Sequence, residues 1–242
     1  DDARQEYKLW KYLKPKLEAE SLLYFFQKIM MPATKVFADM ELAGIKWDQV
    51  KGRELEGRFR ALEEQLLDEL KTELGDINYR SPKQLSKLLF DDLGISTEGV
   101  HLTDKGALST DAETMDLLAP KYPACAKIVD YRTAGKMVNT YCEPLNMYAA
   151  LDTSSRIHAD FWLVSATGRT RCEKPPLQTI PAFLSDKFTG LSIREGFVAR
   201  DGYDFISIDY SQIELRVIAH LSQDPLFLKA YCGWECLACN SS

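Results

Sequence analysis

Asp209-Tyr210-Ser211-Gln212-Ile213-Glu214-Leu215-Arg216 is the stretch of this sequence that decides the fold. It follows an alternating apolar run at residues 205–208, which predicts a β-strand. Ile213, Val217 and Leu221 then recur at helical spacing, which predicts an α-helix with one apolar face. The sequence therefore predicts a carboxylate at the point where a buried strand passes into a helix, a common position for a catalytic or metal-binding acid.

Residues 204–222 as a whole resemble motif A of the family A DNA polymerases over many consecutive positions. The resemblance implies an α/β (α+β) fold, in which a helical thumb is followed by the first part of the antiparallel-sheet palm of a right-hand polymerase. It also implies DNA-directed DNA polymerase activity in replication and repair. The expected partners are primer–template DNA and deoxynucleoside triphosphates, and we expect the protein to be a monomer.

Transfer of a nucleotide to a primer 3′-hydroxyl in this family is expected to use two Mg²⁺ ions, which prefer oxygen ligands and retain waters. By resemblance, Asp209 is one bridging carboxylate, and the backbone carbonyl of Tyr210 completes the shell of one ion. The alternative is that Asp209 only caps the helix that follows it. Within so long a match we favour the metal role.

Glu214 has two possible roles. Ser211 and Glu214 have the spacing of a capping box, in which the Glu side chain accepts a hydrogen bond from the Ser211 backbone N–H. The resemblance instead places Glu214 against the sugar of the incoming nucleotide, where its bulk excludes a ribose 2′-hydroxyl. We favour this sugar-gate role, although the two can coexist, and we interpret Arg216 and His220 as structural. The resemblance places five consecutive residues at the nucleotide: Tyr210, Ser211, Gln212, Ile213 and Glu214.

The composition is that of an ordinary soluble protein with a sizeable core: 242 residues, 45% hydrophobic and 27% charged. No apolar stretch is long enough to span a bilayer, so we expect no membrane partner. The net charge of −6 argues against wholesale electrostatic wrapping of nucleic acid. Local basic patches can still hold a phosphate backbone, so the charge neither supports nor excludes a DNA partner.

The six cysteines fall into two groups. Cys125, Cys142 and Cys172 are scattered, which is typical of reduced thiols in an intracellular protein, cytoplasmic or in the nucleoid if it is bacterial. Three more crowd a tail at residues 229–242, where no histidine lies near enough to complete a zinc site. This tail departs from the family pattern, and we interpret it as the product of a frameshift, an alternative exon or a read-through junction.

Four domains or segments are predicted along the chain. Residues 1–30 resemble the C-terminal helix of an exonuclease-like domain, although Asp2 is better explained as a helix N-cap than as a metal ligand. Pro32 and Gly44 suit the two ends of a helix in the segment that leads into the thumb. The entry segment and thumb are predicted to span residues 31–150, the partial palm 151–228 and the divergent tail 229–242.

The thumb begins with a long helix predicted over residues 50–74, where one apolar stripe runs through a charged segment. Asn78-Tyr79-Arg80-Ser81-Pro82-Lys83-Gln84-Leu85 then resembles a second family signature, with Ser81 as the N-cap of a short helix. Ser81, Lys83 and the first amides of that helix are candidates for holding a phosphate at the thumb tip. A capped surface helix is the open alternative.

Residues 131–141 resemble the returning helix of the thumb. Arg132, Lys136, Asn139 and Thr140 fall at i, i+4, i+7 and i+8, so one helix face carries two cations and two neutral hydrogen-bonding groups. Such a stripe can follow a DNA backbone and position the duplex without reading its sequence.

The palm is predicted to begin with a strand at residues 156–162. Ser165-Ala166-Thr167-Gly168-Arg169-Thr170 and Leu177-Gln178-Thr179-Ile180-Pro181 then resemble the family patterns T-G-R and P-N-L-Q-N-I-P. By resemblance, Arg169 reaches the minor groove at the primer terminus and Gln178 lies beside the template. Arg169 is therefore a third candidate for the catalytic set, beside the two carboxylates of motif A.

The palm segment also departs from the family pattern. Pro176 and Thr179 stand where the family has two Asn residues, and a Pro side chain cannot donate the hydrogen bond that Asn would. Minor-groove contacts test the geometry of a base pair, so the departure weakens the expected contribution to fidelity.

We expect this chain to be an incomplete fragment of a polymerase, inactive alone, because one Asp cannot assemble two metal sites. The family's second palm carboxylate and the fingers helix follow motif A and are not found in this sequence. The alternative is a non-catalytic DNA-binding product that consists of the thumb and a partial palm.

Overall fold

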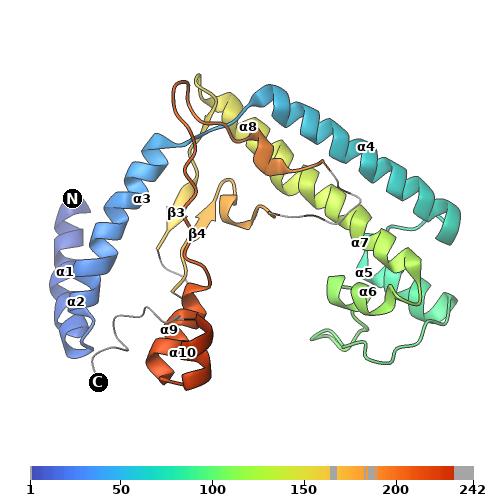
Figure 1. The fold of residues 1–242 in the computed structure, drawn as a ribbon, viewed down its shortest axis with the longest axis horizontal. Coiled ribbons are helices and arrows are strands. Elements are labelled where there is room, and N and C mark those ends of the chain that lie inside the picture. The colour runs from blue at the N-terminus through green and yellow to red at the C-terminus, as the bar shows by residue number, and fades with distance from the viewer. Residues whose placement is uncertain (1, 164–167, 183, 185–187, 189, 232–242) are drawn as a thin grey trace. The chain divides into compact units, whose positions relative to one another are not determined.

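The computed structural model describes residues 2–163, 168–182, 184, 188 and 190–231 (Figure 1). The chain divides into two compact units, Asp1–Asp201 and Gly202–Ser242. This division falls inside the segment predicted as the palm, so motif A belongs to a different unit from the strands before it. The predicted functional boundaries near residues 30, 150 and 228 stay predictions. No helix in the described part of the chain is long and apolar enough to cross a membrane.

The N-terminal helices agree with the sequence pattern. Asp2 lies in the first turn of the first helix, where a carboxylate interacts favourably with the helix dipole, instead of preceding the helix as its cap. The predicted helix between Pro32 and Gly44 is confirmed, and Gly44 ends it with a φ of +59°, a conformation that glycine adopts without steric cost. The elements are α1 (Asp2–Ala19), α2 (Leu23–Phe25), the π-helical η1 (Phe26–Met30) and α3 (Met31–Ala43).

A pair of long helical segments forms the framework of the larger unit. Asp48 caps the first, because its side chain accepts hydrogen bonds from the backbone N–H groups of Val50 (2.9 Å) and Lys51 (3.0 Å). The predicted apolar stripe is confirmed. In Figure 1 the first helix lies alongside the second segment, which is built from three successive elements. These helices are α4 (Gln49–Leu74), then α7 (Pro123–Lys136), the π-helical η3 (Met137–Cys142) and α8 (Glu143–Leu151).

Two hydrophobic cores lie along this helix pair. The N-terminal half of α4 enters the first core through Leu55 and Phe59, and its C-terminal half enters the second through Leu66 and Leu70. Leu62 packs against both. The second core also holds the thumb-tip elements, which are α5 (Pro82–Ser86), the π-helical η2 (Lys87–Asp92) and α6 (Ala112–Leu118).

Trp47 closes the first core beside the start of α4. Its indole Nε1 donates a hydrogen bond to Asn146 Oδ1 (2.8 Å), and its ring meets Phe197 edge-on at 4.9 Å between centroids. A Cβ atom added at Gly52 or Gly196 would lie 2.3 Å from Trp47 ring atoms. Both glycines are therefore needed for the close packing of this indole.

The predicted strand at residues 156–162 divides in two. β2 (Arg156–Ile157) pairs antiparallel with β1 (Ile45–Lys46), whereas β3 (Asp160–Trp162) pairs antiparallel with β4 (Arg171–Glu173). Ile45 pairs with Ile157, so the next partner would be Gly44, where the chain turns into α3. The pairing of β2 with β1 ends there, so the prediction of one continuous strand over residues 156–162 is wrong. Two short 3-10 helices follow, η4 (Leu177–Thr179) and η6 (Ile193–Gly196).

The smaller unit corrects a second strand prediction. Residues 203–210 form no strand, and Ile206 and Ile208 are 84% and 87% exposed. A strand needs a partner for its backbone hydrogen bonds, and no described segment pairs with this one. The predicted helix is confirmed as α9 (Ile213–Ser222), followed by α10 (Pro225–Tyr231).

Candidate nucleic-acid interface and nucleotide site

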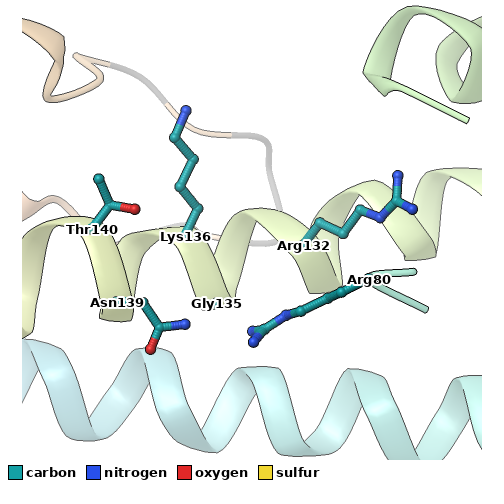
Figure 2. A pocket seen from close by; sticks show the side chains of 6 residues that line it. All are labelled: Arg80, Arg132, Gly135, Lys136, Asn139 and Thr140. Atoms are coloured by element: carbon teal, nitrogen blue, oxygen red, sulfur yellow. The ribbon is translucent and has the colours of Figure 1, made fainter. Parts of the chain in front are cut away.

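The four residues of the predicted backbone stripe lie together. Arg132, Lys136, Asn139 and Thr140 line one open pocket of about 280 Å³ on α7 and η3. In Figure 2, Lys136 and Arg132 extend from the same side of the helix. Lys136 and Asn139 are exposed, whereas Arg132 and Thr140 are half-buried. The structure therefore brings the predicted residues to one surface and leaves an ammonium and an amide open to solvent there.

Arg132 differs from the exposed cation that its position in the stripe suggested. Its Nε donates to the backbone carbonyl of Tyr79 (2.9 Å), and another guanidinium nitrogen donates to the carbonyl of Thr110. Burial lowers the pKa of the Arg132 guanidinium below its ordinary value, although Asp111 partly opposes this. Arg132 thus holds the thumb tip against α7, and a structural role is added to its predicted role at DNA.

Arg80 also lines this pocket and was not predicted as a site residue. It carries an ion pair with Glu63 and lies over the Tyr131 ring, with its guanidinium carbon 5.3 Å from the ring centroid. Arg80 does stand inside the second family signature, between Asn78 and Ser81. Its positive charge within that signature could have marked it as a candidate for phosphate binding. Because it lies far from the stripe in sequence, the helical spacing gave no indication that it shares the pocket.

At the thumb tip, the predicted cap is confirmed. Ser81 Oγ accepts a hydrogen bond from the backbone N–H of Gln84 at 3.4 Å, and Pro82 occupies the first turn of α5. Ser81 is half-buried and Lys83 is exposed. The hydroxyl therefore already serves the helix, and Lys83 is the more accessible of the two predicted phosphate-binding residues.

Arg169 and Gln178 lie close to the β3–β4 hairpin. Gln178 Nε2 donates a hydrogen bond to Thr170 Oγ1 (2.9 Å), which brings Gln178 beside the residue that follows Arg169. Both predicted minor-groove residues are exposed. The predicted T-G-R stretch is described only from Gly168 onward, and Ser165, Ala166 and Thr167 lie outside the described residues.

Thr179, one of the two departures from the family pattern, has a structural role. Its hydroxyl donates to the carbonyl of Pro176 (3.0 Å). The Tyr141 hydroxyl donates to the carbonyl of Thr179 (2.7 Å) and is 3.2 Å from its side-chain oxygen. Thr179 therefore attaches η4 to η3.

The motif A octapeptide is exposed apart from the half-buried Leu215, and it begins α9 without a side-chain cap. The N-cap residue is Gln212, which has a φ of +50°, and its side chain makes no capping hydrogen bond. The predicted capping box is therefore out of register by one residue. The structural role expected for Arg216 is confirmed, since its Nε donates to the Ser211 carbonyl (2.8 Å) and another nitrogen donates to the Tyr231 carbonyl.

Four of the five residues predicted to bind the nucleotide line one open pocket of about 330 Å³. Ser211 is not among its lining residues, and Leu215, which was not predicted, is. Glu214 is therefore one of the residues that line this pocket, and its sugar-gate role stays a prediction. The four predicted residues are Tyr210, Gln212, Ile213 and Glu214.

A metal site on this segment would be incomplete. The Asp209 carboxylate and the Tyr210 carbonyl are oxygen donors of the kind that Mg²⁺ prefers. No group of three or more metal-ligating side chains occurs among the described residues. The donors fit the ion in kind but not in number, so further ligands would have to come from water, substrate or other protein residues.

The sequence is also similar to those of known proteins. Residues 49–235 match the model of DNA polymerase family A. DNA polymerase I of Rhizobium leguminosarum is 37% identical over 234 residues, which are 96% of this chain and 22% of the relative. The thermostable DNA polymerase I of Thermus thermophilus is 36% identical over 231 residues, which are 93% of this chain and 27% of the relative.

A solved structure, the POL domain of Pol1 from M. smegmatis in complex with DNA primer-template and dNTP, is also similar. It is 30% identical, with a TM-score of 0.78, and the match covers 90% of this chain and 38% of that one. The chain spans about a quarter of the length of the curated relatives it matches. Since the family model matches well over half of its residues, the chain belongs to the family A DNA polymerases.

Proposed function

We propose that this chain supplies the thumb and the first part of the palm of a DNA-directed DNA polymerase, which extends a primer 3′-hydroxyl along a template in DNA replication and repair. The observation that carries the proposal is that the four stripe residues line one pocket in a chain that also contains motif A. The M. smegmatis neighbour, solved with primer-template and dNTP, supports the same ligands here.

The thumb pocket would hold the sugar–phosphate backbone. The Lys136 ammonium, the Asn139 amide and the Thr140 hydroxyl can each donate to phosphate or sugar oxygens. Such contacts are the same for every base, so they orient the duplex without selecting a sequence. Lys83 at the tip and Ser81 beside it would add contacts further along the strand.

Arg169 and Gln178 would contact the minor groove beside the primer terminus. Their exposure at the β3–β4 hairpin leaves both side chains accessible to a duplex. Minor-groove acceptors are similar for every correct base pair, so these contacts test pair geometry. The polar atoms of Thr179 already bond within the protein. We therefore expect one fewer contact than in relatives that carry Asn at this position.

Residues 209–214 would serve the incoming deoxynucleoside triphosphate. Asp209 and the carbonyl of Tyr210 would hold Mg²⁺, which when bound supplies positive charge where the transition state accumulates negative charge. Glu214 would occupy the space beside the sugar. The described residues offer no second carboxylate in a metal-binding group, so this chain alone should not incorporate nucleotides.

We further propose that the protein acts as a monomer inside the cell. Cys125, Cys142 and Cys172 are buried, free thiols. Burial raises the pKa of Cys125 to about 11 and that of Cys142 to about 12, which keeps both in the unreactive thiol form. Unpaired thiols are common where glutathione keeps cysteines reduced, which supports an intracellular location.

A non-catalytic DNA-binding product is the second candidate. The observation that favours it is the contrast between the buried cores beside the thumb pocket and the exposed motif A segment. Such a product would retain DNA binding and would need neither nucleotide nor metal. Both candidates predict that the isolated chain binds DNA without extending it, so activity in a completed polymerase distinguishes them.

The first test is binding of a fluorescent primer–template to the chain itself at 50 and 200 mM salt. With three to four phosphate contacts, affinity should fall by roughly 40- to 150-fold over this range, because each neutralised phosphate releases counterions. Lys136→Gln should reduce the slope of log affinity against log salt by about 1. Lys8→Gln on α1, a loss of one exposed lysine outside the pocket, should leave it unchanged. Equal affinities at both salt concentrations would refute the proposed interface.

A further inference from the structure

Arg80 reaches the thumb pocket from a separate segment of the chain. Asn78 fixes the backbone of this segment, since its side-chain oxygen accepts from the Arg80 N–H (3.0 Å) and its carbonyl accepts from the Ser81 N–H (2.9 Å). The side chain then extends toward Gly135, on the side of the helix that carries Asn139 (Figure 2). The pocket therefore receives a third cation that has no place in the helical stripe.

Three neighbours hold the Arg80 guanidinium in place. Glu63 on α4 pairs with one terminal nitrogen, and the Tyr131 ring lies beneath the group. A Cβ atom added at Gly135 would lie 1.7 Å from that nitrogen and 2.8 Å from the guanidinium carbon. Only a residue without a side chain leaves room for the guanidinium here. The absence of a side chain at Gly135 therefore forms a notch in the helix surface, and the Arg80 guanidinium lies in it.

The arrangement leaves positive charge directed at the pocket. Arg80, Arg132 and Lys136 line it, no acidic side chain of the described chain is among the lining residues, and Glu63 pairs with Arg80 from α4. The Arg80 side chain is 42% exposed, against 18% for Glu63. A guanidinium has five N–H donors in one plane, so a contact with Glu63 at one nitrogen leaves donors for an oxyanion on the open side.

We propose that Arg80 binds a backbone phosphate of the DNA duplex in this pocket, and that Glu63 and Gly135 position its guanidinium for that contact. The inference rests on the proposed function, since its ligand is the bound duplex. The competing explanation is that Arg80 only braces the tip against α4 and α7. A brace would contribute to stability and leave the salt dependence of DNA binding unchanged.

The test measures primer–template affinity as a function of salt, together with thermal melting, for the whole chain and three variants. Arg80→Gln should weaken binding about tenfold or more at low salt, as expected for loss of a charged hydrogen bond, and reduce the salt slope by about 1. Lys127→Gln is the matched control. Lys127 also bridges α7 to α4, through Glu69 (3.0 Å) and Glu73 (2.9 Å), but does not line the pocket. It should lower the melting temperature and preserve the slope.

Gly135→Ala tests position without changing any charge. Alanine favours a helix over glycine, so the variant should fold, while its methyl group displaces the Arg80 guanidinium from the notch. Binding should weaken several-fold. Unaltered affinity and slope in both Arg80→Gln and Gly135→Ala would overturn this inference and leave the wider interface intact. Absence of salt-dependent binding in the unmodified chain would overturn both this inference and the proposed function.

Discussion

The α4–α7 helix pair and the segment at residues 202–231 differ in how their structure is held. Along the helix pair, large side chains such as Phe59 and Leu70 are fully buried in two cores. In residues 202–231, Ala219 is the only buried side chain among those described. The segment with the strongest family signature thus has much less tertiary support than the helix pair.

This difference shows that a functional signature and a stability signature need not coincide. The residues of the octapeptide are explained by the chemistry that the family resemblance implies, whereas the leucines of α4 are explained by packing alone. Apolar residues such as Ile206 and Ile208 still carry a strand pattern, which indicates that they are suited to a pairing that the described residues do not provide. Four predictions test the contrast between the two regions.

The largest effect is expected for Asp209→Ala in a chimera, in which residues 1–228 replace the matching segment of the Rhizobium leguminosarum enzyme. Extension should fall about 10⁴-fold in kcat, because metal-bound carboxylates stabilise transition-state charge worth several kcal/mol. DNA affinity should stay within about twofold. Asp224→Ala is the control, since Asp224 accepts hydrogen bonds from Leu226 and Phe227 at the start of α10. Near-normal turnover of the Asp209 variant would remove this carboxylate from the mechanism.

The second prediction compares one core residue with one motif residue in the chain as it stands. Phe59→Ala should lower the free energy of unfolding by about 3–5 kcal/mol, because it empties a fully buried site in the first core. Ile208→Ala should change it by less than about 0.5 kcal/mol, since that side chain is exposed. Urea denaturation gives both values. Similar losses in the two variants would show that residues 205–208 are buried in solution.

Glu214→Ala in the chimera separates the two roles of that residue. If Glu214 is a sugar gate, the ratio of kcat/KM for ribonucleotides to deoxynucleotides should rise about tenfold or more, since the 2′-hydroxyl gains space. Ser211→Ala, which removes the other half of the expected capping box, should leave the ratio unchanged. A lower melting temperature with an unaltered ratio in the Glu214 variant would instead favour a helix-capping role.

The smallest effect contrasts two helix N-termini. Asp111 caps α6 by accepting from the Thr114 N–H (2.9 Å), whereas Ser211 lies outside the N-cap position of α9. Asp111→Ala should cost about 0.5–2 kcal/mol at pH 7, and Ser211→Ala close to nothing. Thermal melts at fixed pH measure both, and equal costs would contradict the assigned caps.

The Asp111 effect should also depend on pH. The Thr114 N–H, followed by Ser109 and His101, lowers the pKa of the Asp111 carboxyl from 3.8 to about 2. Since the folded-state pKa is below the unfolded value, the stabilisation is complete above pH 3.8 and is lost as the pH falls toward 2. The difference between wild type and Asp111→Ala should therefore shrink over that window, and an unchanged difference at pH 2 would exclude the carboxylate as its source.

Much of the helical framework could be predicted because its signals are local. Asp48 and Gly75 bound α4, Gly44 ends α3, and Ser81 caps α5, each within a few residues of the element concerned. The family resemblance likewise depended on consecutive residues. Caps and apolar stripes depend on residues that lie within one or two helical turns of each other. A single sequence therefore contains all the residues that such a signal needs.

The candidate site was predictable in its membership along one helix but not in its assembly. The spacing of Lys136, Asn139 and Thr140 placed them on one surface, and they line one pocket. It did not show that Arg132 is tied to the carbonyls of Tyr79 and Thr110. These contacts join segments far apart in sequence, and periodicity carries no information about them.

By itself, the sequence determined the family, the helices and the candidate carboxylates of this protein. Only the tertiary structure decided that residues 156–162 serve two different sheets, that residues 205–208 form no strand, and that Arg80 lies in the notch at Gly135. The physical reason is the range of the interactions. A helix satisfies its backbone hydrogen bonds within its own segment, whereas strands and pockets need partners that only the folded chain brings together.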